Sequence, residues 1–171
     1  MFGRFKLHTV EMSPEVSGRI TDGGKPLSGV QVARSLAYDG YKDGKEQLEH
    51  TFTNENGEFS FTKMVIKSRK PGSIFGQNMP VLQAIYVERD DKLYQLWYTS
   101  KVWEPVKPLS DLLLRLNADL QNKEIHHEVD TRSYGGMRSQ VVLSICYYQD
   151  RLITSFYNNQ EISTYADIDL F

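Results

Sequence analysis

Apolar and polar residues alternate through two runs near the start of the chain, residues 16–20 and 27–36, which the segment DGGKP separates. In the second run, Val30 and Val32 share one side and Gln31 shares the other with Ala33, the period of two expected of a half-buried strand. The two glycines of the intervening segment permit the positive φ angles of a tight turn. The pattern therefore predicts a β-hairpin.

A second such pattern follows after the polar, glycine-rich segment DGYKDGK at residues 39–45. Residues 47–53 predict a strand with Leu48, His50 and Phe52 on one side. The segment NENG at 54–57 is a turn signal, because Asn-Gly readily supplies left-handed conformations. Phe59 and Phe61 then alternate with polar residues, so we expect a hairpin with one aromatic face.

The rest of the chain continues with short strands. Residues 82–88 and 93–99 predict a hairpin across RDDK, and residues 140–148 predict a strand that pairs with 152–157 across QDR. Residues 110–120 fit either a short helix capped by Ser110 or a buried strand. Residues 64–80, punctuated by Gly and Pro, predict a long loop of the kind that is often functional. Together these elements predict an antiparallel β-sandwich with at most one short helix.

Length and charge limit the classes of function. A chain of 171 residues without a Ser/Gly/Pro linker predicts a single domain over residues 1–171. The net charge of −2 gives no overall field that would attract nucleic acid or an anionic membrane. No run approaches the roughly 18 apolar residues of a membrane span, and the start lacks the apolar core of a secretion signal. If Met1 is the native start, we expect a cytoplasmic protein.

The phrases SGRITDGGKPLSGVQV and TFTNENGEFSF resemble those of the carboxypeptidase regulatory-like, or transthyretin-like, β-sandwich module. The similarity covers about residues 14–62, and the remainder, 63–171, would add further strands and loops. The resemblance implies a fold used mainly for binding or as a scaffold. The opening MFGRFK and the segment RSLAYDG are also similar to a small group of uncharacterised bacterial proteins, loosely associated with toxin and immunity systems. The matching positions are Gly18, Ile20, Pro26, Leu27, Gly29, Val30 and Val32 in the first phrase and Thr51, Thr53, Asn54, Gly57, Phe59 and Phe61 in the second.

Catalytic and metal-binding patterns are missing from the sequence. Cys146 is the only cysteine and lies in the apolar run VVLSICYY, which predicts a buried, unreactive thiol. His126 and His127 would point to opposite faces of a strand and so could not share a metal. The chain has neither a Gly-x-Ser-x-Gly elbow nor a phosphate-binding loop. It also lacks the C-terminal Tyr-Arg-Gly-Ser of the hydroxyisourate hydrolases, the enzymes of the transthyretin-like fold. We therefore expect that the protein is not an enzyme and that it binds no cofactor.

Several segments are candidates for contact with a protein partner. Trp97 and Trp103 lie with Tyr98 near a strand end, and such rings are enriched in interfaces, although the same rings would also suit the sandwich core. Tyr134 stands beside two glycines in RSYGGMR. The loop 63–80 and the acidic segment 161–171 would act through complementary charge or apolar contact. From these two segments the candidates are Arg69, Phe75, Asp167 and Asp169.

These observations favour a protein-binding β-sandwich, in sharper form an immunity-type inhibitor that occludes a cognate bacterial toxin. A carbohydrate- or peptidoglycan-binding module, with Trp97 or Trp103 stacked on sugar rings, is the alternative. A small hydrolase that uses His50 or His126 at an unrecognised site is a third reading. An unpaired edge strand leaves homodimerisation by sheet extension open.

Overall fold

A computed structural model describes residues 6–73, 79–135 and 139–171. Strands dominate it, and it has a single short α-helix, so the predicted mainly-β class is confirmed. The helical elements are α1 (Lys107–Leu113) and the short 3-10 turns η1 (Lys42–Gly44), η2 (Lys70–Gly72), η3 (Arg132–Tyr134) and η4 (Tyr165–Leu170). The strands are β1 (His8–Ser13), β2 (Val16–Asp22), β3 (Lys25–Pro26), β4 (Gln31–Tyr38), β5 (Gln47–Phe52), β6 (Glu58–Phe61), β7 (Met64–Ser68), β8 (Val81–Arg89), β9 (Lys92–Lys101), β10 (Leu116–Asp119), β11 (Ile125–Val129), β12 (Gln140–Ser144), β13 (Ile153–Tyr157) and β14 (Gln160–Ile162).

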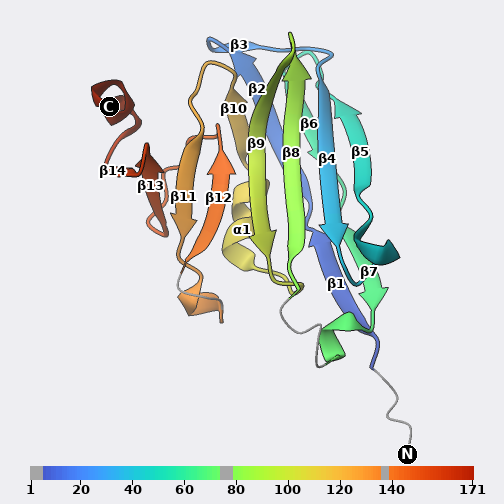
Figure 1. Cartoon of the computed structure of the whole chain (residues 1–171). Coiled ribbons are helices and arrows are strands. Elements are labelled where there is room, and N and C mark those ends of the chain that lie inside the picture. Colours follow the sequence, from blue (N-terminus) through green and yellow to red (C-terminus); the bar gives the residue numbers. More distant parts are fainter. Residues whose placement is uncertain (1–5, 74–78, 136–138) are drawn as a thin grey trace, which may run out of the picture.

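The strands form two layers (Figure 1). One layer is an eight-stranded sheet in the order β14-β13-β11-β12-β9-β8-β4-β5, antiparallel throughout. Behind it in Figure 1 lie β10, β2, β3 and β6, with the pair β1-β7 beside them. The strands β2 and β10 form the parallel pair of this second layer. Helix α1 lies in the same rear layer, behind β9 and β12.

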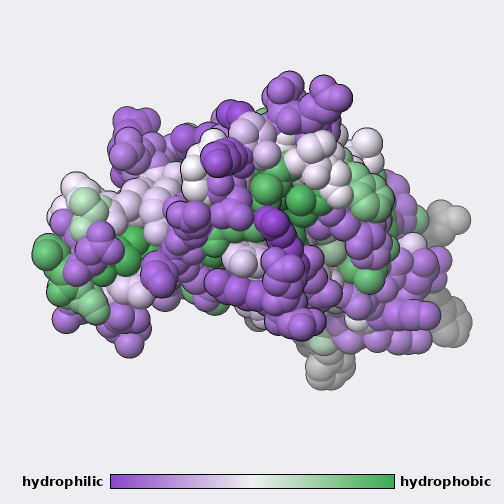
Figure 2. All heavy atoms as spheres, turned by 90° about the horizontal axis from the view of Figure 1, so that it is seen from above, coloured by the Kyte–Doolittle hydropathy of each residue, from purple (hydrophilic) through white to green (hydrophobic). Residues whose placement is uncertain are grey.

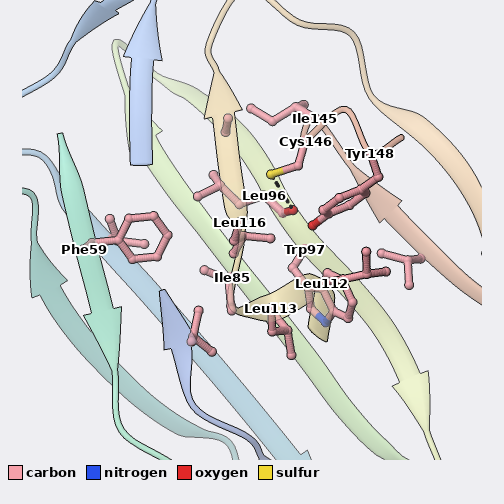
Figure 3. Close-up of a cluster of buried hydrophobic side chains, with 14 of the residues drawn as sticks. Phe59, Ile85, Leu96, Trp97, Leu112, Leu113, Leu116, Ile145, Cys146 and Tyr148 are labelled. Carbon is pink, nitrogen blue, oxygen red and sulfur yellow. Dashed lines mark hydrogen bonds between the residues drawn. The ribbon is translucent and has the colours of Figure 1, made fainter. Parts of the chain in front are cut away.

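The main core fills the space between these layers (Figure 3). Phe59 from β6 and Leu116 from β10 meet Ile85 and Trp97 of the large sheet there, and the apolar side of α1 completes the cluster. Strand β9 supplies two consecutive core residues, because a β-bulge leaves Leu96 unpaired between the pairs Trp97–Ile85 and Gln95–Tyr86. The bulge therefore changes which side chains of β9 face the core.

Two cations, Arg34 and Lys101, are buried in the fold. The guanidinium of Arg34 pairs with Glu49, donates to the Thr62 carbonyl at 2.8 Å and stacks over the Phe61 ring. The ammonium of Lys101 donates to three backbone carbonyls at 2.8–3.2 Å, and it lies 3.7 Å from the buried carboxylate of Glu11. Burial lowers the pKa of Lys101 to about 8. These two side chains tie β1 and the segment after β9 to the large sheet.

The two phrases of the first third form the turns that they predict, but both predicted hairpins need correction. The first turn closes across residues 23 and 24 and pairs β2 with the two residues of β3, whereas most of the run 27–36 belongs to β4, which lies in the other sheet and pairs with β5 and β8. In the second turn, Gly57 has φ +76, and a Cβ there would lie 2.4 Å from the Ile20 carbonyl oxygen, so only glycine fits. The predicted hairpin after it is wrong, however, because β5 pairs with β4 while β6 pairs with β2. The turn carries the chain from one layer to the other, and this puts Phe59 and Phe61 in the core.

Three further expectations need correction. The predicted loop 64–80 begins with β7, which pairs with β1, and residues 74–78 lie outside the described part of the chain. The ambiguous segment 110–120 contains both elements, since α1 ends at Leu113 and β10 begins at Leu116; Ser110 is not the cap, because α1 begins at Lys107 after the N-cap residue Val106. Strand β13 pairs with β11 and β14 instead of β12, which lies between β9 and β11. The hairpin β8–β9 forms as predicted, with Asp90 and Asp91 at positive φ.

The C-terminal residues build a smaller body at one end of the large sheet. Ile125, Ile162 and Ile168 form its buried centre, and Tyr147 stacks on Tyr165 with 4.0 Å between ring centres. Figure 2, which views the strand ends from above, shows hydrophobic residues exposed at this end of the molecule. Among the described residues, no helix has both the length and the apolar character needed to traverse a bilayer.

Candidate binding face

The large sheet has one side packed on the core and one side without a covering layer. We call the second side, which faces away from β2, the outer face; in Figure 1 it faces the viewer, and no described strand or helix lies over it. Cross-strand pairing places one residue from each of the eight strands in a single line on this face. This central row reads, from β5 to β14, Leu48, Ser35, Ala84, Tyr98, Leu143, His126, Phe156 and Glu161.

Apolar side chains dominate the middle of the outer face. Leu48 and Tyr98 in the central row, with Leu82 and Val141 in the neighbouring row, are each 41–47% exposed. Tyr86 and Leu143 between them are half-buried. Leu82, Tyr98, Leu143 and Val141 lie on the adjacent strands β8, β9 and β12, whereas Ser35 and Ala84 separate Leu48 from Tyr98 in the central row. Exposed apolar groups that gather in this way commonly mark interaction sites.

The centre of this surface also contains two polar side chains, of which Ser35 has a hydrogen-bond partner among the described residues and the Nε2 atom of His126 does not. The hydroxyl of Ser35 donates to the carboxylate of Glu46, which therefore lies over the sheet beside Leu48. The imidazole of His126 packs edge-on against Phe156 and lies 3.7 Å from the carboxylate of Glu128. The face therefore offers rings and aliphatic groups more than free donors, which suits a protein surface better than a small polar ligand.

Glutamates border the apolar residues. Glu46, Glu88, Glu128 and Glu161 occupy outward positions on or next to β5, β8, β11 and β14, and we call these four the glutamate border. Burial raises the pKa of the Tyr86 phenol, and the negative charges of Glu46 and Glu88 raise it further. The field at Tyr86 is therefore negative.

The structure separates the residues that the sequence singled out. Trp97 is completely buried, and its indole nitrogen donates to Gln83, so the expectation that it contacts a partner is wrong. The reason is the bulge, which turns Trp97 into the core and leaves its neighbour Tyr98 on the outer face. Trp103 is half-buried and packs edge-on against His8.

The remaining described candidates fall on three separate segments, the start of η2, η3 and η4, and none of them belongs to a strand of the outer face (Figure 1). Arg69 is exposed before η2, whereas Tyr134 is exposed in η3 at the opposite side of the lower end. In the C-terminal segment, Asp167 is occupied as a capping group that accepts from the backbone N–H groups of residues 163 and 164, and Asp169 is exposed. Phe75 lies outside the described residues. No single surface unites these positions.

A cleft of about 360 Å³ lies in the C-terminal body, between β13, β14 and residues 148–150. Ser155 lines it and donates to His127 Nδ1 at 2.9 Å, while His127 Nε2 donates to the Cys146 carbonyl at 3.1 Å. Burial lowers the pKa of His127 to about 4, so the ring is neutral and a weak base. Both ring nitrogens are satisfied, and the pair holds β11 to β13 and residue 146. The predicted opposite orientation of His126 and His127 is confirmed.

One signal in the sequence could have revealed the outer face. In a one-sided sheet, alternate strand residues are polar, whereas β8 and β12 have apolar residues in both alternating sets, Leu82 with Ile85 and Val141 with Val142. Strands with apolar residues on both sides are typical of sheets that are covered on both faces.

The sandwich architecture and the uncovered sheet define a class, a mainly-β domain with one open sheet face. Residues 16–123, well over half of the chain, match the model of a family described as a domain of unknown function, DUF6795. The chain belongs to this family. The match covers β2 to β10 and leaves out β1 and β11 to β14. Neither the curated proteins nor the solved structures contain a significant match.

Proposed function

We propose that this chain is a non-enzymatic binding protein whose outer face contacts another protein. The observation that supports this is the set of apolar side chains in two neighbouring rows of the open sheet, with Leu48, Leu82, Tyr98 and Val141 all 41–47% exposed. Burying such side chains contributes about 25 cal/mol per Å² of apolar area, and aromatic residues at the centre of an interface commonly dominate its energy. Tyr98 is the residue that best fits this central role.

The finer proposal is a cytoplasmic, immunity-type protein that inhibits a cognate bacterial toxin by covering its active site or substrate path. It draws on the resemblance of residues 14–62 to the transthyretin-like binding module, whose matching phenylalanines, Phe59 and Phe61, lie in the core here. A broad, flat face is suited to covering an opening on another protein.

The alternatives have less support. A carbohydrate-binding role would need an exposed ring platform, and burial removes Trp97 from that role. A hydrolase would need an activated nucleophile; Ser155 has a histidine partner, but a ring with a pKa of about 4 withdraws protons poorly at neutral pH. We therefore assign the Ser155–His127 pair to stability.

The proposal is tested with the purified product of the neighbouring gene, by size exclusion and calorimetry. Tyr98→Ala and Tyr134→Ala form a matched pair, because the two phenols are 44% and 49% exposed and lie on different surfaces. We expect Tyr98→Ala to weaken binding at least tenfold, as for an interface hot spot, and Tyr134→Ala to leave it unchanged. The reverse result would move the interface to η3, and absence of a complex at micromolar concentration would count against the proposal.

A further inference from the structure

The charges of the large sheet are divided between its two sides. Among the described strand residues that face outward, some are acidic, and none is lysine or arginine. The basic residues of these strands point the other way and are occupied there. Arg34 pairs with Glu49, Arg89 lies 3.4 Å from Asp22 of β2, and the ammonium of Lys92 lies over the Tyr94 ring.

This division makes the strand positions of the outer face negative as well as apolar; beside β11 and β13, Arg132 and Arg151 line a pocket together with Glu128 and Thr154. The glutamate border lies around Tyr86, Tyr98 and Leu82. The carboxylates of Glu46 and Glu88 contribute to the raised pKa of Tyr86. A partner surface that carries lysine or arginine opposite the border would gain favourable pairs at the edge of the contact. Complementary charge of this kind mainly speeds and orients docking.

The same charges disfavour two other occupants. A second copy that packed by the same face would bring glutamates against glutamates, and like charges in an interface are destabilising. A nucleic acid would present phosphates to the same carboxylates. In size the face is adequate for a protein, since eight strands at about 4.8 Å spacing give a row roughly 34 Å long, comparable to one side of a standard interface.

The following inference rests on the proposed function. We propose that the outer face binds a cationic protein surface that has an apolar centre bordered by lysine or arginine. It does not bind a second copy of this chain. The central row supplies the apolar contact and the glutamate border selects the charge of the partner. Tyr98 and Leu82 lie at the middle of the contact, with Glu46, Glu88 and Glu128 around them.

The charge preference is tested with two synthetic 14-residue amphipathic peptides, one of leucine and lysine and the other of leucine and glutamate. In NMR titrations of the full chain, we expect the lysine peptide to shift the resonances of Leu82, Tyr98 and Leu143, with an affinity that falls as salt is added. The glutamate peptide is the matched control and should cause no such shifts. Equal binding of the two peptides, or shifts confined to the cleft near Ser155, would overturn the inference.

Variants of the border provide a second measurement. The triple substitution Glu46→Gln, Glu88→Gln and Glu128→Gln should weaken the lysine peptide about tenfold at low salt, since each exposed ion pair contributes roughly 0.2–1 kcal/mol. Unchanged affinity would contradict the inference. Sedimentation of the unmodified chain up to about 200 μM should give a monomer, and a dimer that Tyr98→Ala abolishes would assign the face to a second copy instead.

The two proposals fail in different ways. Suppose that the neighbouring gene product binds in a Tyr98-dependent manner but neither salt nor the triple substitution changes its affinity. The outer face is then an interface, and the inferred preference for a cationic partner is wrong. If that product does not bind while the lysine peptide shifts the face as expected, the charge preference holds and the identity of the partner is wrong.

Discussion

The backbone of Gly18 in β2 lies directly against that of Leu116 in β10, and a Cβ on Gly18 would be 2.1 Å from the Leu116 carbonyl oxygen. Only glycine permits this approach, which positions the parallel pair over the core. Gly18→Ala should therefore force the strands apart and lower the free energy of unfolding by about 3 kcal/mol, measured by urea denaturation. Gly24→Ala is the control: its Cβ meets no atom within 4 Å, and only its positive φ costs about 1 kcal/mol. Equal losses in the two variants would contradict this account.

His127 should make the fold sensitive to acid. Its pKa falls from 6.5 to about 4 on folding, mainly through burial, so between these values the unfolded chain binds more protons than the native one. Stability therefore falls as the pH drops from about 6.5 to 4, by about 3 kcal/mol at roughly 1.4 kcal/mol per unit. His127→Gln, which can still donate to the Cys146 carbonyl, should lower stability at pH 7 but flatten this dependence. Urea midpoints between pH 4 and 7 test it, and a parallel decline in the two proteins would rule it out.

Cys146 should not react in the native protein. The thiol is completely buried, lies 3.6 Å from the Leu96 carbonyl oxygen, and has a pKa that burial raises to about 12 (Figure 3). Because the thiolate is the reactive form, a disulfide reagent at pH 8 should label it only as fast as the protein unfolds. Labelling in urea is the positive control. Rapid labelling of the folded chain would show that this part of the core opens locally.

The buried pair of Glu11 and Lys101 should be costly to break from one side. Lys101→Met leaves the Glu11 carboxylate, which is 3% exposed, with Lys63 at 3.2 Å as its remaining cation, and leaves three backbone carbonyls without their donor. We expect a loss of about 3 kcal/mol in the free energy of unfolding. The double variant Glu11→Gln with Lys101→Met removes the buried negative charge as well and should lose less than the single variant. A larger, additive loss would show that the two side chains act independently.

Local patterns in the sequence predicted local structure well. The turn at residues 54–57, the hairpin of β8 and β9, the burial of Cys146 and the mainly-β class all follow from turn residues and alternation. These patterns could not predict which sheet a strand joins. Strands β5 and β6 read as a hairpin because the residues around Gly57 are those of a tight turn, yet the two strands belong to different layers.

The position of the candidate site depends on the β-bulge in β9, which the alternation of apolar and polar residues does not reveal. A single extra residue, Leu96, shifts the parity of β9, so the ring that the sequence favoured, Trp97, turns inward and Tyr98 turns outward. The central row itself arises from the register of eight strands, six of them separated from a neighbour in the row by long stretches of chain. The spacing of residues in the sequence does not show which strands pair, so the row can be identified only from the arrangement of strands in the sheet.

The central row also crosses the boundary of the family match. Leu48, Ser35, Ala84 and Tyr98 lie within residues 16–123, whereas the other half of the row, from Leu143 to Glu161, comes from strands that the match leaves out. The proposed binding surface thus combines residues that the family description covers with residues that it does not. A chain that shares only the matched part would present half of this surface.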